Sequence, residues 1–350
     1  MNKLKLAIFL IVLLFSFSCL LFKTIFNIFP WEWIAYGPIP DDVLYDYIGK
    51  FGRNYPSTIK GNWEPSMMHM AKIVLDDSEN IKSLGINTLS VSIEYHISTN
   101  GTPYLNPMEE EMFKSNIVRA KQKGFAVLVA PNFVGPDPRP FSEKGINMDL
   151  KKYLDMSEQV ALKWAKISED YGVEFFAPQN ELDVMIDQFV NDEEEKSRVV
   201  SEWHEEILPK IKQIFTGKMM AKLADSREND YFNGYDYVGT TIFHRGYALE
   251  NFRNYINRTY FTISQVAEKS NCSWLVSEAW MPYSFPFSKN ENGESLDGLQ
   301  DDYFKIATEE YLRYNYTNPA GFVFIAWIMD GMDIKNRPSE QVLREFYSKI

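Results

Sequence analysis

Short apolar runs alternate with longer amphipathic stretches over most of the chain, beginning near residue 58. The short runs are rich in β-branched and aromatic residues, and most are apolar without alternation, which is typical of strands buried on both faces. The pattern predicts eight strands, at residues 58–61, 88–93, 126–130, 174–177, 219–223, 237–242, 274–277 and 321–326.

The stretches between these runs carry helical periodicity. Gly85, Gly124 and Gly172 each follow such a stretch directly and precede a strand, as C-terminal glycines of helices do. The link of residues 225–236 is too short for a full helix. Seven helices are expected, near residues 71–84, 109–123, 150–171, 194–215, 249–269, 301–314 and 340–347.

Regular alternation of strand and helix indicates a parallel sheet, and eight such units favour closure into a (β/α)8 TIM barrel. An open doubly wound sheet is the main alternative, but no G-x-G-x-x-G loop follows the first strand. We therefore expect one α/β catalytic domain at residues 50–350, with a connector at residues 30–49.

The N-terminus has the features of a signal anchor. Lys3 and Lys5 precede residues 6–22, a run without charge that is just long enough to span a bilayer. Residues 1–29 are expected to form a transmembrane segment, with the amino end in the cytoplasm and the remainder exported.

Two other outcomes remain open for this segment. Ser16-Phe17-Ser18 resembles a cleavage site, and cleavage would release a secreted domain. Cys19 follows directly, so lipid modification is a further alternative. We favour the uncleaved anchor, which places the domain outside the cytoplasm and tethers it to the membrane.

Composition narrows the class of partner. The net charge is -12, and this argues against nucleic acid, which requires clustered Lys and Arg. Aromatic residues make up 15% of the chain. A carbohydrate partner is compatible with this composition because sugars stack on aromatic rings. The acidity also has a simpler explanation, since it confers solubility.

Polar and aromatic residues recur where the predicted strands end, which is where active sites of such barrels gather. Asn180 and Glu181 close the fourth strand, Glu278 closes the seventh and Trp327 closes the eighth. Further candidates for substrate binding stand at the ends of other strands: Trp63, Tyr95, His96, Asn132, His244 and Trp280.

On these residues the chain resembles the clan A glycoside hydrolases, the superfamily that contains β-mannanases, β-galactanases and cellulases. The resemblance implies that Glu181 is the acid/base, that Asn180 binds the sugar 2-hydroxyl and that Glu278 is the nucleophile. The sequence departs from many members at the end of the second strand, where Glu94-Tyr95-His96 stands in place of an arginine.

Retaining hydrolysis of a glycosidic bond requires two carboxyl groups about 5–5.5 Å apart, one protonating the leaving oxygen and one attacking the anomeric carbon. We expect Glu181 and Glu278 to form this pair and to cleave β-linked glycans by double displacement. Trp327 is expected to form the floor of the sugar site. His244 either bonds the nucleophile or the substrate or has a structural role, and the same alternative holds for Tyr95, His96 and Asn132.

Two alternative hypotheses assign the protein to other functional classes. A catalytically silent, membrane-tethered barrel would bind glycan through the same mouth without turnover. A metal-dependent hydrolase is disfavoured because the chain has only four histidines and no H-E-x-x-H motif. The expected mechanism needs no cofactor and no metal.

Overall fold

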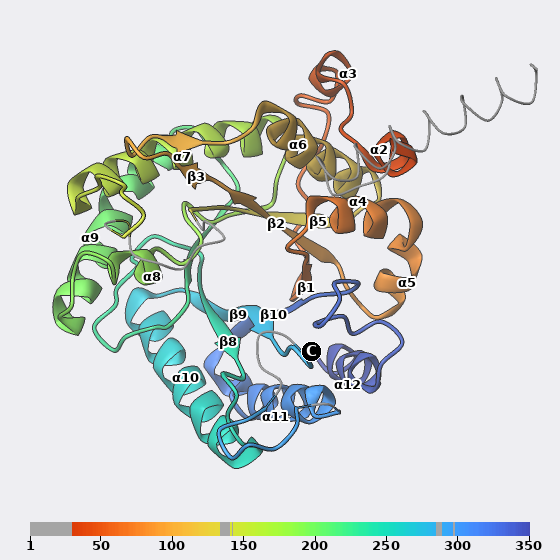
Figure 1. The fold of residues 1–350 in the computed structure, drawn as a ribbon, viewed down its shortest axis with the longest axis vertical. Helices are drawn as coiled ribbons and strands as arrows, with labels where there is room; N and C mark the ends of the chain where they lie inside the picture. The colour runs from red at the N-terminus through yellow and green to blue at the C-terminus, as the bar shows by residue number, and fades with distance from the viewer. Residues whose placement is uncertain (1–29, 134–140, 142, 285–288, 297) are drawn as a thin grey trace, which may run out of the picture.

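The fold is a closed barrel of eight parallel strands surrounded by helices, as the sequence predicts (Figure 1). It is taken from a computed structural model that describes residues 30–133, 141, 143–284, 289–296 and 298–350. Around the barrel the strands lie in the order β1-β10-β9-β8-β7-β6-β5-β2. Their bounds are β1 Ile59–Trp63, β2 Thr88–Glu94, β5 Ala126–Asn132, β6 Phe175–Phe176, β7 Lys218–Leu223, β8 Tyr237–Phe243, β9 Ser273–Trp280 and β10 Pro319–Ile325.

The helices form a ring around the strands (Figure 1). The helices in the predicted helical regions are α4 Met67–Asp76, α5 Ser78–Ser83, α6 Pro107–Gln122, α7 Leu150–Asp170, α9 Glu193–Lys212, α10 Leu249–Ser270, α11 Gln300–Arg313 and α12 Pro338–Tyr347. All eight predicted strands and all seven predicted helical regions are confirmed, except that the region 71–84 forms two helices, α4 and α5. Residues 225–236 contain no helix, also as predicted.

Some elements differ from the sequence-based expectation. The connector range 30–49 contains two short helices, α2 (Pro30–Tyr36) and α3 (Asp41–Tyr45). A small hairpin of β3 (His96–Ile97) and β4 (Pro103–Tyr104) extends the connection after β2, and α8 (Leu182–Ile186) follows β6. These short elements lie in connections outside the repeating strand–helix unit. The apolar pattern of the sequence therefore does not reveal them.

Side chains alternate between the inside of the barrel and the layer beneath the helices. Ala126, Leu128 and Ala130 of β5 belong to the inner cluster, whereas Val127 and Val129 pack against the helices. By the same alternation Asn132 faces inward at the end of the strand. This arrangement buries both faces of each strand and explains the uninterrupted apolar runs of the sequence.

A β-bulge in β9 redirects its last residues. Thr240 of β8 pairs with Val276, but the next residue, Thr241, pairs with Glu278, so Ser277 is the extra residue. Val276 packs beneath the helices. Without the bulge Glu278 would share that orientation, so the bulge is what turns its carboxyl group inward.

The predicted anchor at residues 1–29 lies outside the described residues. Within the ranges that the structure describes, no helix combines the length and the apolar character needed to cross a membrane. The first described helix, α2, packs on α4 through an ion pair of 2.8 Å between Lys72 and Glu32 and a hydrogen bond from Tyr36 to Asp76.

Candidate active site

The mouth of the barrel holds a buried ion pair between Lys222 of β7 and Glu278 of β9. The Lys222 ammonium contacts Oε1 of Glu278, and both side chains are almost fully buried. The second oxygen, Oε2, accepts a hydrogen bond of 2.7 Å from the indole nitrogen of Trp280. Because each oxygen is engaged by a different donor, the carboxyl group of Glu278 is fixed in orientation.

Lys222 also organises Asn180. The same ammonium contacts the side-chain oxygen of Asn180, and Asn180 forms a bridge with Lys222 along the sheet edge. The backbone of this segment is held on both sides, because the Asn180 amide donates to the Pro131 carbonyl at 2.6 Å and the Glu181 amide donates to the Lys222 carbonyl at 3.1 Å. The Lys222 ammonium thus links Glu278, the predicted nucleophile, to Asn180, the residue predicted to bind the sugar 2-hydroxyl.

Glu181 stands at the turn from β6 into α8 with a left-handed backbone, φ 51° and ψ 51°. A non-glycine residue in this region stores roughly 1–3 kcal/mol of strain, and such residues cluster at active sites. Its Oε1 accepts a hydrogen bond of 2.5 Å from the Thr241 hydroxyl of β8. The turn therefore directs the carboxyl group toward β8 and β9.

The environment of Glu181 differs from that of Glu278. The pKa of Glu181 is raised to about 7, first by burial and then by the negative charge of Glu278, while the charge of Lys222 acts in the opposite direction. Thr241, which bonds Glu181, is the register partner of Glu278 on the neighbouring strand. Adjacent strands lie about 4.8 Å apart, so the two carboxyl groups face the same small volume. Glu181 has a raised pKa, whereas Glu278 is ion-paired with Lys222.

Aromatic rings surround this pair on one side. Trp280 lies 5.6 Å from Trp63 and 6.4 Å from Phe243 between ring centroids. Trp63 belongs to the inner cluster, and Trp280 packs against it while remaining partly exposed. The structure therefore brings two of the three predicted tryptophans, Trp63 and Trp280, to the mouth, and Trp280 donates a hydrogen bond to Glu278.

Polar residues line the opposite side, at the ends of β2 and β5. Asn132 is buried, and its side-chain oxygen has no hydrogen-bond partner among the described residues. Its neighbour in the sheet, Glu94, is inward by alternation, and burial raises the pKa of its carboxyl group. An unsatisfied buried acceptor at the mouth is what a binding site for hydroxyl groups presents.

Two predicted binding residues lie elsewhere. Trp327 is 1% exposed, packs beneath the helices and donates its indole N–H to Asp77, which caps the junction of α4 and α5. Tyr95 packs in the same outer layer and accepts a hydrogen bond of 3.0 Å from Trp164 of α7. The expectation that Trp327 forms the sugar floor and that Tyr95 lines the pocket is wrong, because both side chains point away from the barrel interior.

His244 has the structural role that the sequence left open as an alternative to bonding the nucleophile or the substrate. Its Nδ1 accepts a hydrogen bond of 2.9 Å from the Gly246 amide, and its Nε2 lies 2.9 Å from the Pro282 carbonyl. Burial lowers the pKa of His244 to about 4, so the ring is neutral. Since both nitrogens bond backbone groups, His244 holds two loops together and is not positioned to bond Glu278. His96, by contrast, is exposed on the β3–β4 hairpin and stays a prediction.

Two further buried carboxyl groups brace the mouth. Asp183 of α8 accepts hydrogen bonds of 3.0 and 2.9 Å from the amides of Ala224 and Asp225, tying the Glu181 turn to the end of β7. Glu64, after β1, accepts from the amides of Trp327 and Ile328 after β10. Burial raises the pKa of Glu64 to about 8 and that of Asp183 to about 6.

Sequence reasoning missed Lys222 and Thr241. Both follow the inward parity of their strands, Lys222 after Met220 and Thr241 after Gly239, within runs that are otherwise apolar or small. A lysine at an inward position near the end of a buried strand is the signal that was available, because such a charge requires a partner.

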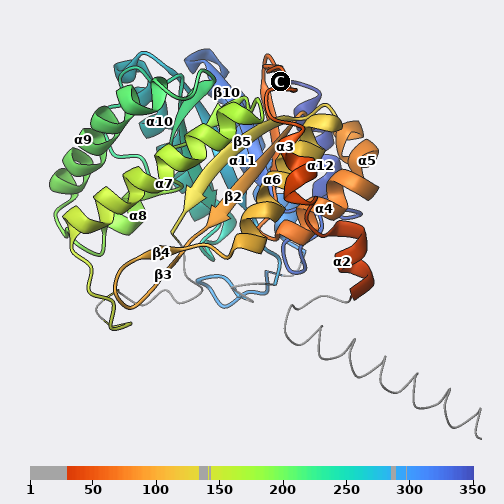
Figure 2. The same ribbon diagram turned by 90° about the horizontal axis from the view of Figure 1, so that it is seen from above.

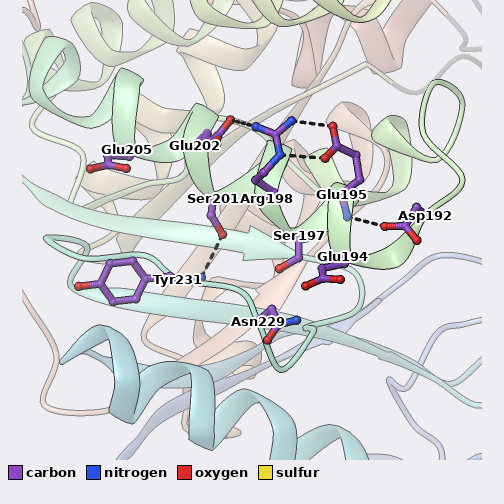
Figure 3. Close-up of a pocket in the computed structure, with 10 residues that line it drawn as sticks. All are labelled: Asp192, Glu194, Glu195, Ser197, Arg198, Ser201, Glu202, Glu205, Asn229 and Tyr231. Atoms are coloured by element: carbon purple, nitrogen blue, oxygen red, sulfur yellow. Dashed lines mark hydrogen bonds and ion pairs between the residues drawn. The ribbon is translucent and has the colours of Figure 1, made fainter.

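Within the described ranges, no group of three or more histidine, cysteine, aspartate or glutamate side chains is placed to hold a metal ion. A hollow of about 520 Å³ lies beside α9, and five of its ten lining residues are acidic (Figure 3). Arg198 pairs with Glu195 and Glu202 there, and Asp192 caps the helix. These contacts are those of a solvated helix surface.

No protein-family model matches the chain, and no curated protein matches it significantly. Solved structures do. A β-1,4-mannanase of glycoside hydrolase family 113 aligns with a TM-score of 0.62 and 15% identity, over 84% of this chain and 100% of its own. The family 113 β-mannanase of Alicyclobacillus acidocaldarius aligns with a TM-score of 0.59 and 13% identity, over 84% and 98%.

A β-glucuronidase from an uncultured Clostridium is also similar, with a TM-score of 0.55 and 17% identity, over 87% of this chain and 53% of its own. At identities this low, the structural similarity shows a shared fold and does not show a shared activity. The chain therefore has the (β/α)8-barrel fold of family 113 mannanases and related glycoside hydrolases.

Proposed function

We propose that this protein is a retaining glycoside hydrolase that cleaves β-linked glycans. The observation that carries the proposal is the pairing of two carboxyl groups with opposed environments at the barrel mouth. Glu181, whose pKa is raised to about 7, supplies the proton, and Glu278, ion-paired with Lys222, supplies the nucleophile.

In the first step Glu278 attacks the anomeric carbon while Glu181 protonates the departing oxygen, giving a glycosyl ester on Glu278. In the second step Glu181, now ionised, removes a proton from water, and the water displaces the ester. Loss of the Glu278 charge on esterification removes one cause of the raised pKa of Glu181. The change favours ionisation of Glu181 when a base is needed.

Other groups at the mouth support the proposal. Lys222 and Trp280 hold the carboxylate of Glu278, and we propose that Asn180 and Asn132 bond sugar hydroxyls. Trp63 and Trp280 offer ring surface for stacking. The mannanases with the same fold make β-1,4-mannan the first substrate to test.

One observation favours a glycan-binding protein without turnover. Both oxygens of Glu278 are engaged, one by Lys222 and one by Trp280, and these bonds reduce the nucleophilicity of the carboxylate. Hydrogen bonds of free enzymes commonly rearrange when substrate binds, and for this reason we place hydrolysis first.

We also infer from the sequence that residues 1–29 anchor the chain in a membrane, with the barrel outside the cytoplasm. The inference stands on the uncharged run at residues 6–22 and the flanking lysines.

The test of the proposed activity is hydrolysis by the full chain in detergent or nanodiscs, measured on β-1,4-mannan, β-1,4-glucan, β-1,4-galactan and aryl β-glycosides. The anomeric form of the first product is followed by proton NMR. Products that keep the β-configuration support the proposal. Products with the α-configuration, or binding of a glycan with no turnover on any panel member, contradict it.

A further inference from the structure

The first helix of the described chain enters the domain from the mouth end of the barrel. The strand β1 runs toward the mouth, so α4, which follows it, begins at that end and runs away from it. Along α2, Glu32 pairs with Lys72 and the later residue Tyr36 pairs with Asp76. The contacts advance together along both helices, so α2 runs parallel to α4.

The start of α2 therefore points to the mouth end. Figure 2 shows α2 at the same end of the barrel as the β3–β4 hairpin, with the C-terminus at the opposite end. After α2 the chain returns along α6, since Arg119 bonds the carbonyls of Tyr36 and Gly37 and Ser115 accepts from the amide of Ile39. These contacts fix the direction of entry within the fold.

The membrane anchor inferred from the sequence lies directly before α2 in the chain. The uncharged run closes at Phe22, and α2 begins at Pro30, so seven residues separate the two. A fully extended chain spans at most about 3.3–3.6 Å per residue, which limits the separation to roughly 25–30 Å. A tether this short, joined at the mouth end, holds the mouth near the bilayer surface.

Side chains at the mouth end suit an interface with lipid. Tyr104 on β4 is 54% exposed, Met108 in the first turn of α6 is 40% exposed and Val184 on α8 is 44% exposed. Ile34 on α2 is 86% exposed. Exposed apolar side chains also occur at other places on the surface, such as Tyr55, so the direction of α2 carries the argument and these residues accord with it.

We propose that the barrel mouth faces the membrane in which the chain is anchored, and that its substrate is a glycan held at that membrane surface. The proposal rests on the proposed hydrolase activity for the substrate and on the anchor for the orientation. A glycan attached to a lipid headgroup, or the membrane-proximal part of a surface polysaccharide, reaches such a mouth. A long soluble polymer does not reach it, because the bilayer lies in front of the mouth.

Orientation is tested independently of activity. The full chain, with Cys19 and Cys272 replaced by alanine, carries a single fluorophore at Tyr104→Cys on the hairpin or at Lys349→Cys near the C-terminus. Each variant is reconstituted into phosphatidylcholine vesicles that contain a lipid with a headgroup spin label. Phosphatidylcholine is chosen because acidic residues such as Glu109 and Asp187 flank the mouth.

The proposal predicts strong quenching of the label at position 104 and little at position 349. Equal quenching, or stronger quenching at position 349, overturns the orientation. Recovery of the full chain in the aqueous phase, separate from the vesicles, overturns it as well. None of these readings requires turnover, so they remain decisive if the proposed hydrolase activity fails.

The substrate is tested with vesicles that present a glycan from the active panel on a lipid, compared with the same glycan free in solution. At equal total concentration we expect at least tenfold faster hydrolysis of the lipid-borne form by the anchored chain. Detergent, which removes the surface, should abolish the difference. Equal rates on both forms overturn the proposed substrate class, whereas absence of hydrolysis on both counts against the proposed function.

Discussion

The ammonium group of Lys222 contacts both the carboxylate of Glu278 and the side-chain oxygen of Asn180. The two strands and the turn that supply these residues are thereby joined at one buried cation. Removal of one partner from a buried ion pair costs roughly 3–5 kcal/mol, because the remaining charge is left uncompensated.

Replacement of Lys222 by methionine is therefore expected to lower kcat/KM by about 100-fold or more, whereas Lys222→Arg should retain part of the activity. The matched control is Lys121→Met, which breaks a second buried pair, with Glu174 at the far end of the barrel. The control should lose stability in thermal unfolding but keep its activity at a temperature where it is folded. Wild-type activity in Lys222→Met would refute this role.

The pH dependence of kcat/KM should show a descending limb near pH 7. Glu181 must be protonated to act as the acid, and its pKa is raised to about 7 by burial and by the charge of Glu278. The Thr241 hydrogen bond lowers the pKa of Glu181, so Thr241→Val should move the descending limb to higher pH. Initial rates between pH 4 and 9 locate the descending limb in the wild type and in Thr241→Val. A shift to lower pH in Thr241→Val would contradict the assignment.

The two carboxyl groups should respond differently to rescue. In Glu278→Ala, azide can occupy the vacated space and attack from the opposite face of the leaving group, which gives a glycosyl azide of inverted configuration. In Glu181→Ala, an aryl glycoside with a good leaving group needs no proton for the first step, so azide should accelerate the second step and give a retained azide product. Product analysis by NMR separates the roles, and the reverse pattern would exchange them.

Substitution of Trp280 should reduce activity, whereas substitution of Trp327 should reduce stability. Trp280→Phe removes the N–H donor to Glu278, so we expect a fall in kcat of at least tenfold with little change in the unfolding temperature. Trp327→Phe removes the bond to Asp77 in the outer layer and should reduce stability by about 1–3 kcal/mol while leaving kcat and KM near wild type. A larger loss of activity in Trp327→Phe would return that residue to the binding site.

Glu64 should make stability depend on pH. Its pKa is raised from 4.5 to about 8 by burial, so the folded state favours the protonated form. The corresponding stability is complete below about pH 4.5 and is lost as the pH rises toward 8, amounting to a few kcal/mol at roughly 1.36 kcal/mol per pKa unit. Glu64→Gln keeps an acceptor for Trp327 and lacks the titration. Denaturant unfolding across this range should show a decline in wild type that is absent in the variant.

The eight-strand order and the positions of Glu181 and Glu278 could be predicted because each depends on local periodicity and on the rule that sites gather at strand ends. The orientation of individual side chains could not. Trp327 ends an apolar run in the sequence, yet it packs in the outer layer with Asp77, a residue 250 positions earlier. Glu278 points inward through a bulge at Ser277, which no periodic pattern reveals.

Lys222 shows a different limit. The rule that sites gather at strand ends favours residues after the last apolar position, whereas Lys222 lies inside its strand, one residue before Leu223. Its importance depends on a contact with Glu278, 56 residues later in the chain, and on burial of both groups. Such relationships arise only when the barrel closes.

The most direct measurement is to trap the glycosyl ester on the protein. The full chain is incubated with the 2-deoxy-2-fluoro β-glycosyl fluoride of the sugar that it cleaves, digested and examined by mass spectrometry, with Glu278→Gln as the control. Double displacement predicts one added fluorosugar on the peptide that contains Glu278, and none in the control. A label on another residue, or hydrolysis of the fluoride with inversion and without any adduct, would contradict the proposed mechanism.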